Sequence, residues 1–105
     1  MIIYDMKTED LINPIGIDEK KPRFSWKLQS KISGTVQTAY RIIVLSDKDT
    51  VWDSGKVTSD RSICIEYDGR SLSAMTKYSW QVSVWDEQGN EYKSDTADFE
   101  TGLMN

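Results

Sequence analysis

The chain has 105 residues, which fits one domain with one core, and 38% of its residues are apolar. Its formal net charge of −4, with lysines and arginines scattered, leaves no basic stripe, so neither nucleic acid nor a membrane is an expected partner. Histidine is absent and Cys64 is the single cysteine, which excludes an intrachain disulfide, a thiolate zinc site and the usual general base. We expect no metal and no cofactor.

The first residues, MIIYDMKTED, lack the basic region and the long apolar run of a signal peptide. No segment is long enough to span a bilayer, so the chain as written is expected to be cytoplasmic. Residues 6–17 predict an edge strand, which the turn signal NPIG brings to an end.

Alternation of apolar and polar residues is the main pattern in the rest of the chain, and it predicts β-strands. These strands are expected at 24–28, 39–46, 50–57, 63–67, 78–86 and 97–101. Turn signals separate them, including DSG, YDGR and DEQGN, and no window shows a helical stripe. About seven short strands predict an all-β antiparallel sandwich spanning 1–105 as one domain, with a closed barrel as the alternative.

Several large side chains lie in phase with this alternation and are therefore predicted to be structural core. They are Trp26, Tyr40, Leu72, Tyr78, Trp80 and Phe99. Leu72 stands six residues before Tyr78, where the chain enters a strand, and this spacing is typical of the tyrosine corner of Greek-key sandwiches. In that corner the tyrosine hydroxyl bonds to the backbone a few residues upstream, which gives a buried phenol its partner.

Trp52 and Trp85 are the candidate contact residues. Trp85 falls on the polar face of the stretch YSWQVSVWD, and Trp52 lies in the short segment TVWDSGKV. Each ring could stack on a sugar, or it could pack within the domain or against a neighbouring one. Packing is favoured, because a bare tryptophan is costly for solubility.

Carboxylates are plentiful, but most stand in turn sequences. They include Glu9, Asp10, Asp18, Asp47, Asp49, Asp53, Asp86 and Glu87. A glycosidase needs two carboxyl groups across a cleft, one of them with a raised pKa. Turn formation and solvation are the favoured interpretation, so no catalytic residue is predicted.

Six motifs occur in an order that resembles a known family. They are NPIGID, PRFSW, QTAYRI followed by Val44, WDSGKV, YSWQVSVWD and FETGL. Over Leu11 to Leu103 the chain resembles the N-terminal module of bacterial α-L-rhamnosidases. This resemblance implies a fold similar to fibronectin type III and immunoglobulin domains. It also implies that catalysis belongs to a helical (α/α)₆ barrel downstream, where two acidic residues would hydrolyse terminal α-L-rhamnose.

The resemblance implies that the chain is the N-terminal fragment of a larger enzyme and has no activity by itself. Its expected partners are then the downstream domains of the same chain. Two alternatives stay open: a carbohydrate-binding module that holds a rhamnose-containing glycan weakly, and an independent adhesion or scaffold domain that shares only the fold.

Overall fold

Ten β-strands make up the part of the protein that its computed structural model describes, residues 1–30 and 34–104. The strands are β1 (Ile2–Thr8), β2 (Ile15–Ile17), β3 (Arg23–Gln29), β4 (Gln37–Ser46), β5 (Asp49–Asp53), β6 (Val57–Thr58), β7 (Ile65–Glu66), β8 (Lys77–Asp86), β9 (Glu91–Lys93) and β10 (Ala97–Thr101). Among these residues, no helix is long and apolar enough to cross a membrane. The all-β prediction is confirmed.

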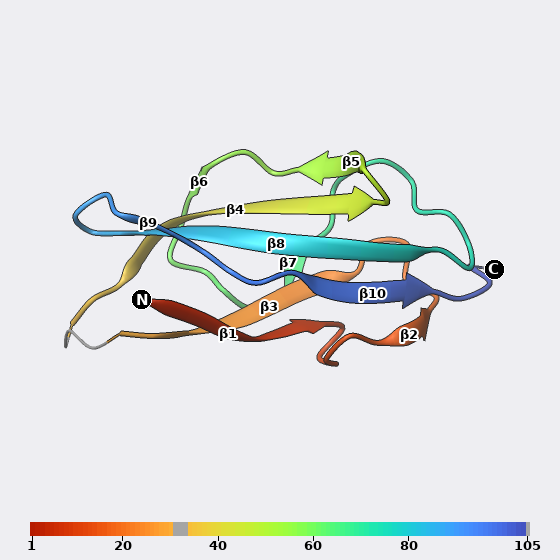
Figure 1. Ribbon diagram of the computed structural model, residues 1–105, viewed down its shortest axis with the longest axis horizontal. Coiled ribbons are helices and arrows are strands. Elements are labelled where there is room, and N and C mark those ends of the chain that lie inside the picture. The colour runs from red at the N-terminus through yellow and green to blue at the C-terminus, as the bar shows by residue number, and fades with distance from the viewer. Residues whose placement is uncertain (31–33, 105) are drawn as a thin grey trace.

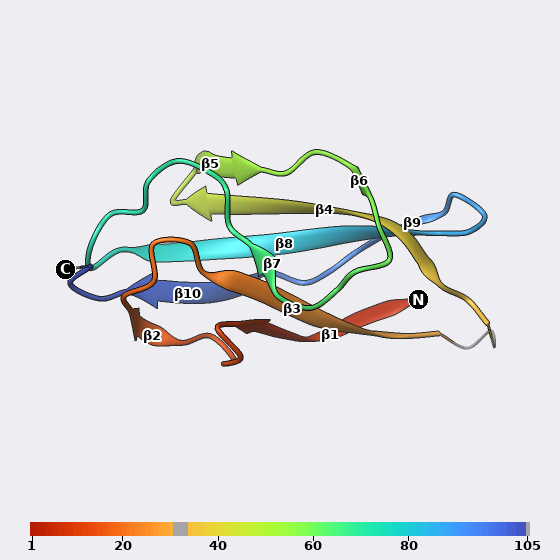
Figure 2. The same cartoon turned by 180° about the vertical axis from the view of Figure 1, so that it is seen from behind.

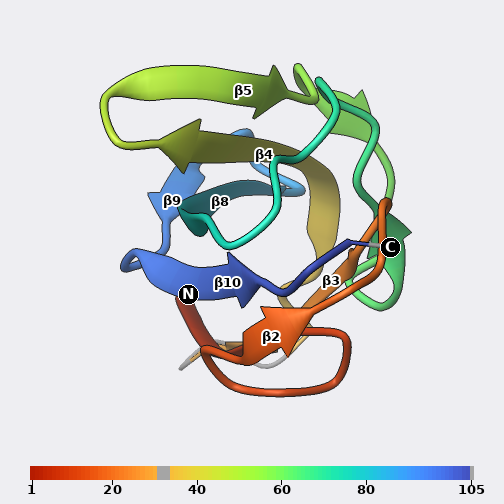
Figure 3. The same ribbon diagram turned by 90° about the vertical axis from the view of Figure 1, so that its right-hand side faces the viewer.

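The strands form two sheets that lie one over the other (Figure 1). The larger sheet has the order β2-β10-β8-β4-β5, with β6 added to β4 and β9 added to β8. Its curvature is seen end-on in Figure 3, from β5 through β4 and β8 to β10. The smaller sheet has the order β1-β3-β7, and β7 is seen beside β3 from behind (Figure 2). The sandwich prediction is therefore confirmed, and the barrel alternative is wrong.

The opening segment differs from the single edge strand predicted for residues 6–17. It splits into β1, which pairs with β3, and β2, which pairs in parallel with β10 in the other sheet. Left-handed backbone at Glu9, Asp10 and Asn13, with φ of 51°, 63° and 46°, turns the chain between the two strands. The Asn13 side chain then accepts a hydrogen bond from the Asp98 amide at 3.0 Å, which holds the turn against β10.

The core lies between the sheets and is built on the apolar face of β8. Tyr78, Trp80, Val82 and Val84 are each at most 3% exposed. Phe24 of β3 meets this face, with its ring centroid 4.7 Å from that of Trp80. Each fully buried side chain of this size contributes about 1.5–3 kcal/mol by leaving water, so the alternation in β8 is a main source of stability.

The strand predicted over residues 63–67 shortens to the two residues of β7. Cys64 has a left-handed φ of 55°, and Ile63 is 64% exposed, so the alternation is broken there. Side chains take the place of strand partners for the backbone here. The Ser25 hydroxyl accepts a hydrogen bond from the Cys64 amide at 3.0 Å, and the Arg61 guanidinium donates to the Ile63 and Cys64 carbonyls. Cys64 is therefore not the strand residue that the pattern indicated.

Candidate functional site

Trp85 lies on the outer face of the larger sheet, away from the core. On β8 it follows the inward-facing Val84, and its neighbours across the strands are Ala39 on one side and Glu91 on the other. The Lys56 ammonium stands 4.6 Å from the centroid of the indole ring, a cation–π contact. Ala39 is buried and small, so it leaves room for the half-buried indole beside it.

Trp52 lies on the opposite, inner face of the same sheet. It pairs with Val44, which also pairs with Trp80, so its side chain points toward the core. Its ring stacks on Phe24 at 6.2 Å between centroids and meets Tyr67 edge-on at 5.3 Å. Of the alternatives open for Trp52, the structure shows packing within the domain, because the register of β5 turns its ring inward.

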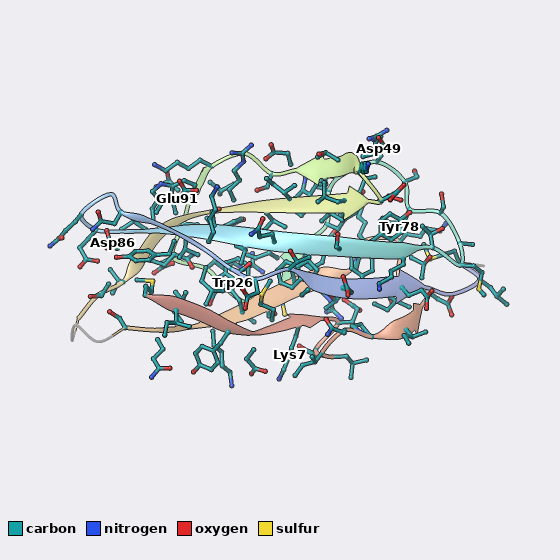
Figure 4. All side chains as sticks on the ribbon, in the orientation of Figure 1. Lys7, Trp26, Asp49, Tyr78, Asp86 and Glu91 are labelled. Atoms are coloured by element: carbon teal, nitrogen blue, oxygen red, sulfur yellow. The ribbon has the colours of Figure 1, made fainter. Side chains whose placement is uncertain are left out.

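The residues predicted to form the core lie at its centre or its margin. Trp26 is 2% exposed, and its indole N–H donates to the Gln37 side-chain oxygen at 3.1 Å. Figure 4 shows Trp26 between the two layers, whereas Lys7 is on the outside of β1. The Tyr40 ring meets Trp26 edge-on at 5.6 Å between centroids. Trp80 is 1% exposed.

Tyr78 makes the corner contact that the spacing predicted. Its hydroxyl oxygen accepts a hydrogen bond from the Ser73 backbone N–H at 2.7 Å, five residues upstream. Its ring stacks on Phe99 of β10, with centroids 5.2 Å apart. Leu72 is half-buried and packs against the core from its margin. The corner therefore joins the β7–β8 connection to the larger sheet.

Carboxylates whose pKa departs from its ordinary value are all shifted downward in the described part of the chain. Hydrogen bonds from Arg41 lower the pKa of Asp53 to about 2, and those from Arg23 lower the pKa of Glu9. Burial would raise the pKa of Asp86, but hydrogen bonds from Asn90, Gln88 and Tyr92 hold it below its usual range. A glycosidase acid needs the opposite shift.

Turn formation accounts for Asp86, whose carboxylate closes the β8–β9 hairpin (Figure 4). One oxygen accepts from the backbone N–H groups of Gln88 and Asn90, both at 2.9 Å, and the other from the Tyr92 hydroxyl at 3.1 Å. Within the described residues, no group of three His, Cys, Asp or Glu side chains is placed to hold a metal ion. Asp86 is therefore a structural group of this hairpin.

A different set of side chains, which the sequence analysis did not single out, is exposed at one end of the sandwich. Ile15, Met75 and Leu103 are 81%, 70% and 66% exposed. They come from three segments far apart in the sequence: Ile15 lies in the motif NPIGID and Leu103 in FETGL, whereas Met75 lies in none of the six motifs. Their apolar character near turn sequences is a signal in the sequence, but it does not show that the three side chains lie at the same end of the fold.

Two facing sheets, chain crossings between them and a corner tyrosine define the class of this protein as an immunoglobulin-like β-sandwich. The model of one family in this class, described as "Rha78A-like, N-terminal immunoglobulin domain", matches residues 3–105. The chain belongs to this family.

Similar proteins carry the name α-L-rhamnosidase. One from Formosa agariphila is 39% identical over 100 residues, covering 88% of this chain, and one from Streptomyces avermitilis is 42% identical over 97 residues, covering 87%. The chain spans about a tenth of their length, 10% and 9% respectively.

Solved structures show the same relationship. The α-L-rhamnosidase from Dictyoglumus thermophilum superposes with a TM-score of 0.93 at 41% identity, over 100% of this chain and 13% of that one. The Streptomyces avermitilis α-L-rhamnosidase complexed with L-rhamnose gives a TM-score of 0.93 at 38% identity, over 98% of this chain and 11% of that one.

Proposed function

We propose that this domain is a non-catalytic structural module at the N-terminus of an α-L-rhamnosidase, and that the complete enzyme removes terminal α-L-rhamnose from glycosides. One observation carries the proposal: the chain matches an N-terminal domain family over nearly its whole length, yet spans 10% of a relative named for the activity. In this proposal, the chemistry resides in the rest of the parent chain, and this domain packs against its other domains.

The lowered carboxylate pKa values support the non-catalytic role. The pKa of Asp53 is lowered to about 2, so its carboxyl is ionised near neutral pH and cannot donate a proton to a leaving group there. Glu9 is held by Arg23, whose Nε lies 3.1 Å from its carboxylate oxygen. Each of these acids serves an ion pair in the fold.

Deleting the domain from the parent enzyme tests the structural role. Full-length enzyme and a version lacking residues 1–105 are compared for kcat, KM and the half-life of activity at a raised temperature. We expect a shorter half-life in the truncated enzyme, with kcat and KM little changed before inactivation. Equal half-lives would contradict a structural role, and a large rise in KM alone would favour substrate binding.

The carbohydrate-binding alternative is restricted to Trp85, because Trp52 faces the core. The Lys56 ammonium lies over the Trp85 ring, where a sugar would have to stack. An NMR titration with L-rhamnose tests this alternative: shifts of the Trp85 indole signal at tens of millimolar sugar would support it. An unchanged spectrum at that concentration would reject it.

A further inference from the structure

Three exposed apolar side chains, Ile15, Met75 and Leu103, lie at this end of the sandwich, and we call them together the end surface. Main-chain contacts bring its three segments together. The Met75 amide donates to the Gly102 carbonyl at 2.9 Å, and Gly102 donates to the Ile17 carbonyl at 2.7 Å. Figure 1 and Figure 2 both show the C-terminal residues here, beside the end of β10.

Met75 has a backbone conformation that its side chain does not favour. Its φ is 53°, in the left-handed region. Asp10, Asn13 and Asp47 also have positive φ, and their short polar side chains tolerate that region; Met104, with φ of 60°, shares the conformation of Met75. A long apolar side chain at such a position, 70% exposed to water, contributes little to the isolated domain. The contacts within this domain therefore do not account for the Met75 side chain.

A hollow of about 410 Å³ is lined in part by Met104, the residue that follows Leu103. The hollow is lined by Lys20, Lys21, Tyr67, Gly69, Arg70, Ser71, Leu72 and Met104. The Met104 amide donates to the Asp18 carboxylate at 3.0 Å, so residues 102–104 are fixed against the domain and do not hang free. Chain that continues from here starts next to both the hollow and the end surface.

We propose that the end surface is the docking site for the segment that follows residue 105 in the longer chain, and for the domain that this segment enters. The inference rests on the proposed function, in which most of the enzyme follows this module. A tethered partner has a high effective concentration, so a small apolar surface is enough to hold it. The last described residues lie within the surface itself, which makes the following chain the nearest occupant.

Side-chain burial in the full-length enzyme tests the proposal. Single cysteines are placed by Met75→Cys and by Leu103→Cys in a Cys64→Ser background, with Val36→Cys as the matched control, since Val36 is 54% exposed away from this surface. Maleimide labelling rates are measured by peptide mass mapping, in the full-length enzyme and in the 105-residue chain. We expect labelling at 75 and 103 to slow by about tenfold or more in the full-length enzyme, a free energy of about 1.4 kcal/mol, with position 36 unchanged.

Slowing at position 36 alone, or at none of the three positions, would overturn the proposal. Slow labelling at 75 and 103 in the 105-residue chain that is relieved by dilution would also overturn it, because the occupant would then be a second copy. Turnover of an aryl α-L-rhamnoside by the same full-length preparation separates this result from the proposed function. With turnover but no protection, only the docking site is wrong; without turnover, the proposed function fails.

Discussion

Trp52 and Trp85 lie on opposite faces of one sheet. Trp52 stacks on Phe24 inside the sandwich, whereas Trp85 lies outside under the Lys56 ammonium. Two tryptophans that each precede an aspartate in the sequence therefore have different physical roles. The first stabilises the fold, and the second belongs to the surface of the domain.

Truncating the two tryptophans should separate these roles. Trp52→Ala is expected to destabilise the 105-residue chain by about 3 kcal/mol, because it removes ring contacts with Phe24 and Tyr67. Trp85→Ala removes one surface cation–π contact and should cost about 1 kcal/mol or less. Urea unfolding measures both. A loss of about 3–5 kcal/mol for Trp85→Ala would show that Trp85 is core.

Removing the corner hydroxyl should weaken the connection between β7 and β8. Tyr78→Phe keeps the stacked ring but leaves the Ser73 amide without its 2.7 Å partner, which should cost about 1–2 kcal/mol. Tyr4→Phe is the control, because Tyr4 is 44% exposed and should change stability by no more than about 0.5 kcal/mol. Equal urea unfolding midpoints for the two variants would contradict a contribution of the corner hydrogen bond to stability.

Gly69 allows the close approach of the β7–β8 connection to β5. A Cβ at this position would lie 2.6 Å from both the Tyr67 hydroxyl and the Val51 carbonyl oxygen, and it would also meet Trp52. Gly69→Ala should therefore destabilise the chain by about 1–3 kcal/mol, as overpacking does. Gly55→Asn is the control, since a Cβ there meets nothing and asparagine tolerates its φ of 69°. A neutral Gly69→Ala would show that this contact is loose.

Acid should remove the contribution of the Arg41–Asp53 ion pair to the stability of the fold. Hydrogen bonds from Arg41 lower the folded-state pKa of Asp53 from 3.8 to about 2. The unfolded chain therefore binds this proton more readily, so the stabilisation is full above pH 3.8 and is lost as the pH falls toward 2. The side chains are 44% and 37% exposed, so solvent screens the effect and keeps it small.

Thermal midpoints of the parent chain and of Asp53→Asn, measured from pH 5 down to about 2, test this. The difference between the thermal midpoints of the two proteins should become smaller as the pH falls. A constant gap would show that the charge of Asp53 contributes nothing, and a widening gap would contradict the sign.

The sequence predicted the features that depend on local pattern. Alternation in β8 predicted its buried face, and the spacing of Leu72 and Tyr78 predicted the corner, because period and spacing are read along one segment. The face of Trp52 could not be read in this way. It depends on the pairing of β5 with β4, which shifts register between Val44 and Leu45.

Long-range contacts also explain the other differences. Residues 6–17 split between two sheets because β2 pairs with β10, which lies more than eighty positions away in the chain. Cys64 leaves the strand pattern because Ser25 and Arg61 supply hydrogen bonds to its backbone. The end surface joins residues 15, 75 and 103, whose proximity only the folded chain reveals.

Turnover of an aryl α-L-rhamnoside, measured for the 105-residue chain and for the complete product of its coding region, tests whether this domain is the non-catalytic part of an α-L-rhamnosidase. We expect no turnover above buffer for the 105-residue chain and enzyme-specific turnover for the complete product. Turnover by the 105-residue chain that follows its concentration and is lost on unfolding would contradict the non-catalytic assignment. A complete product that leaves the substrate intact would contradict the assignment to an α-L-rhamnosidase.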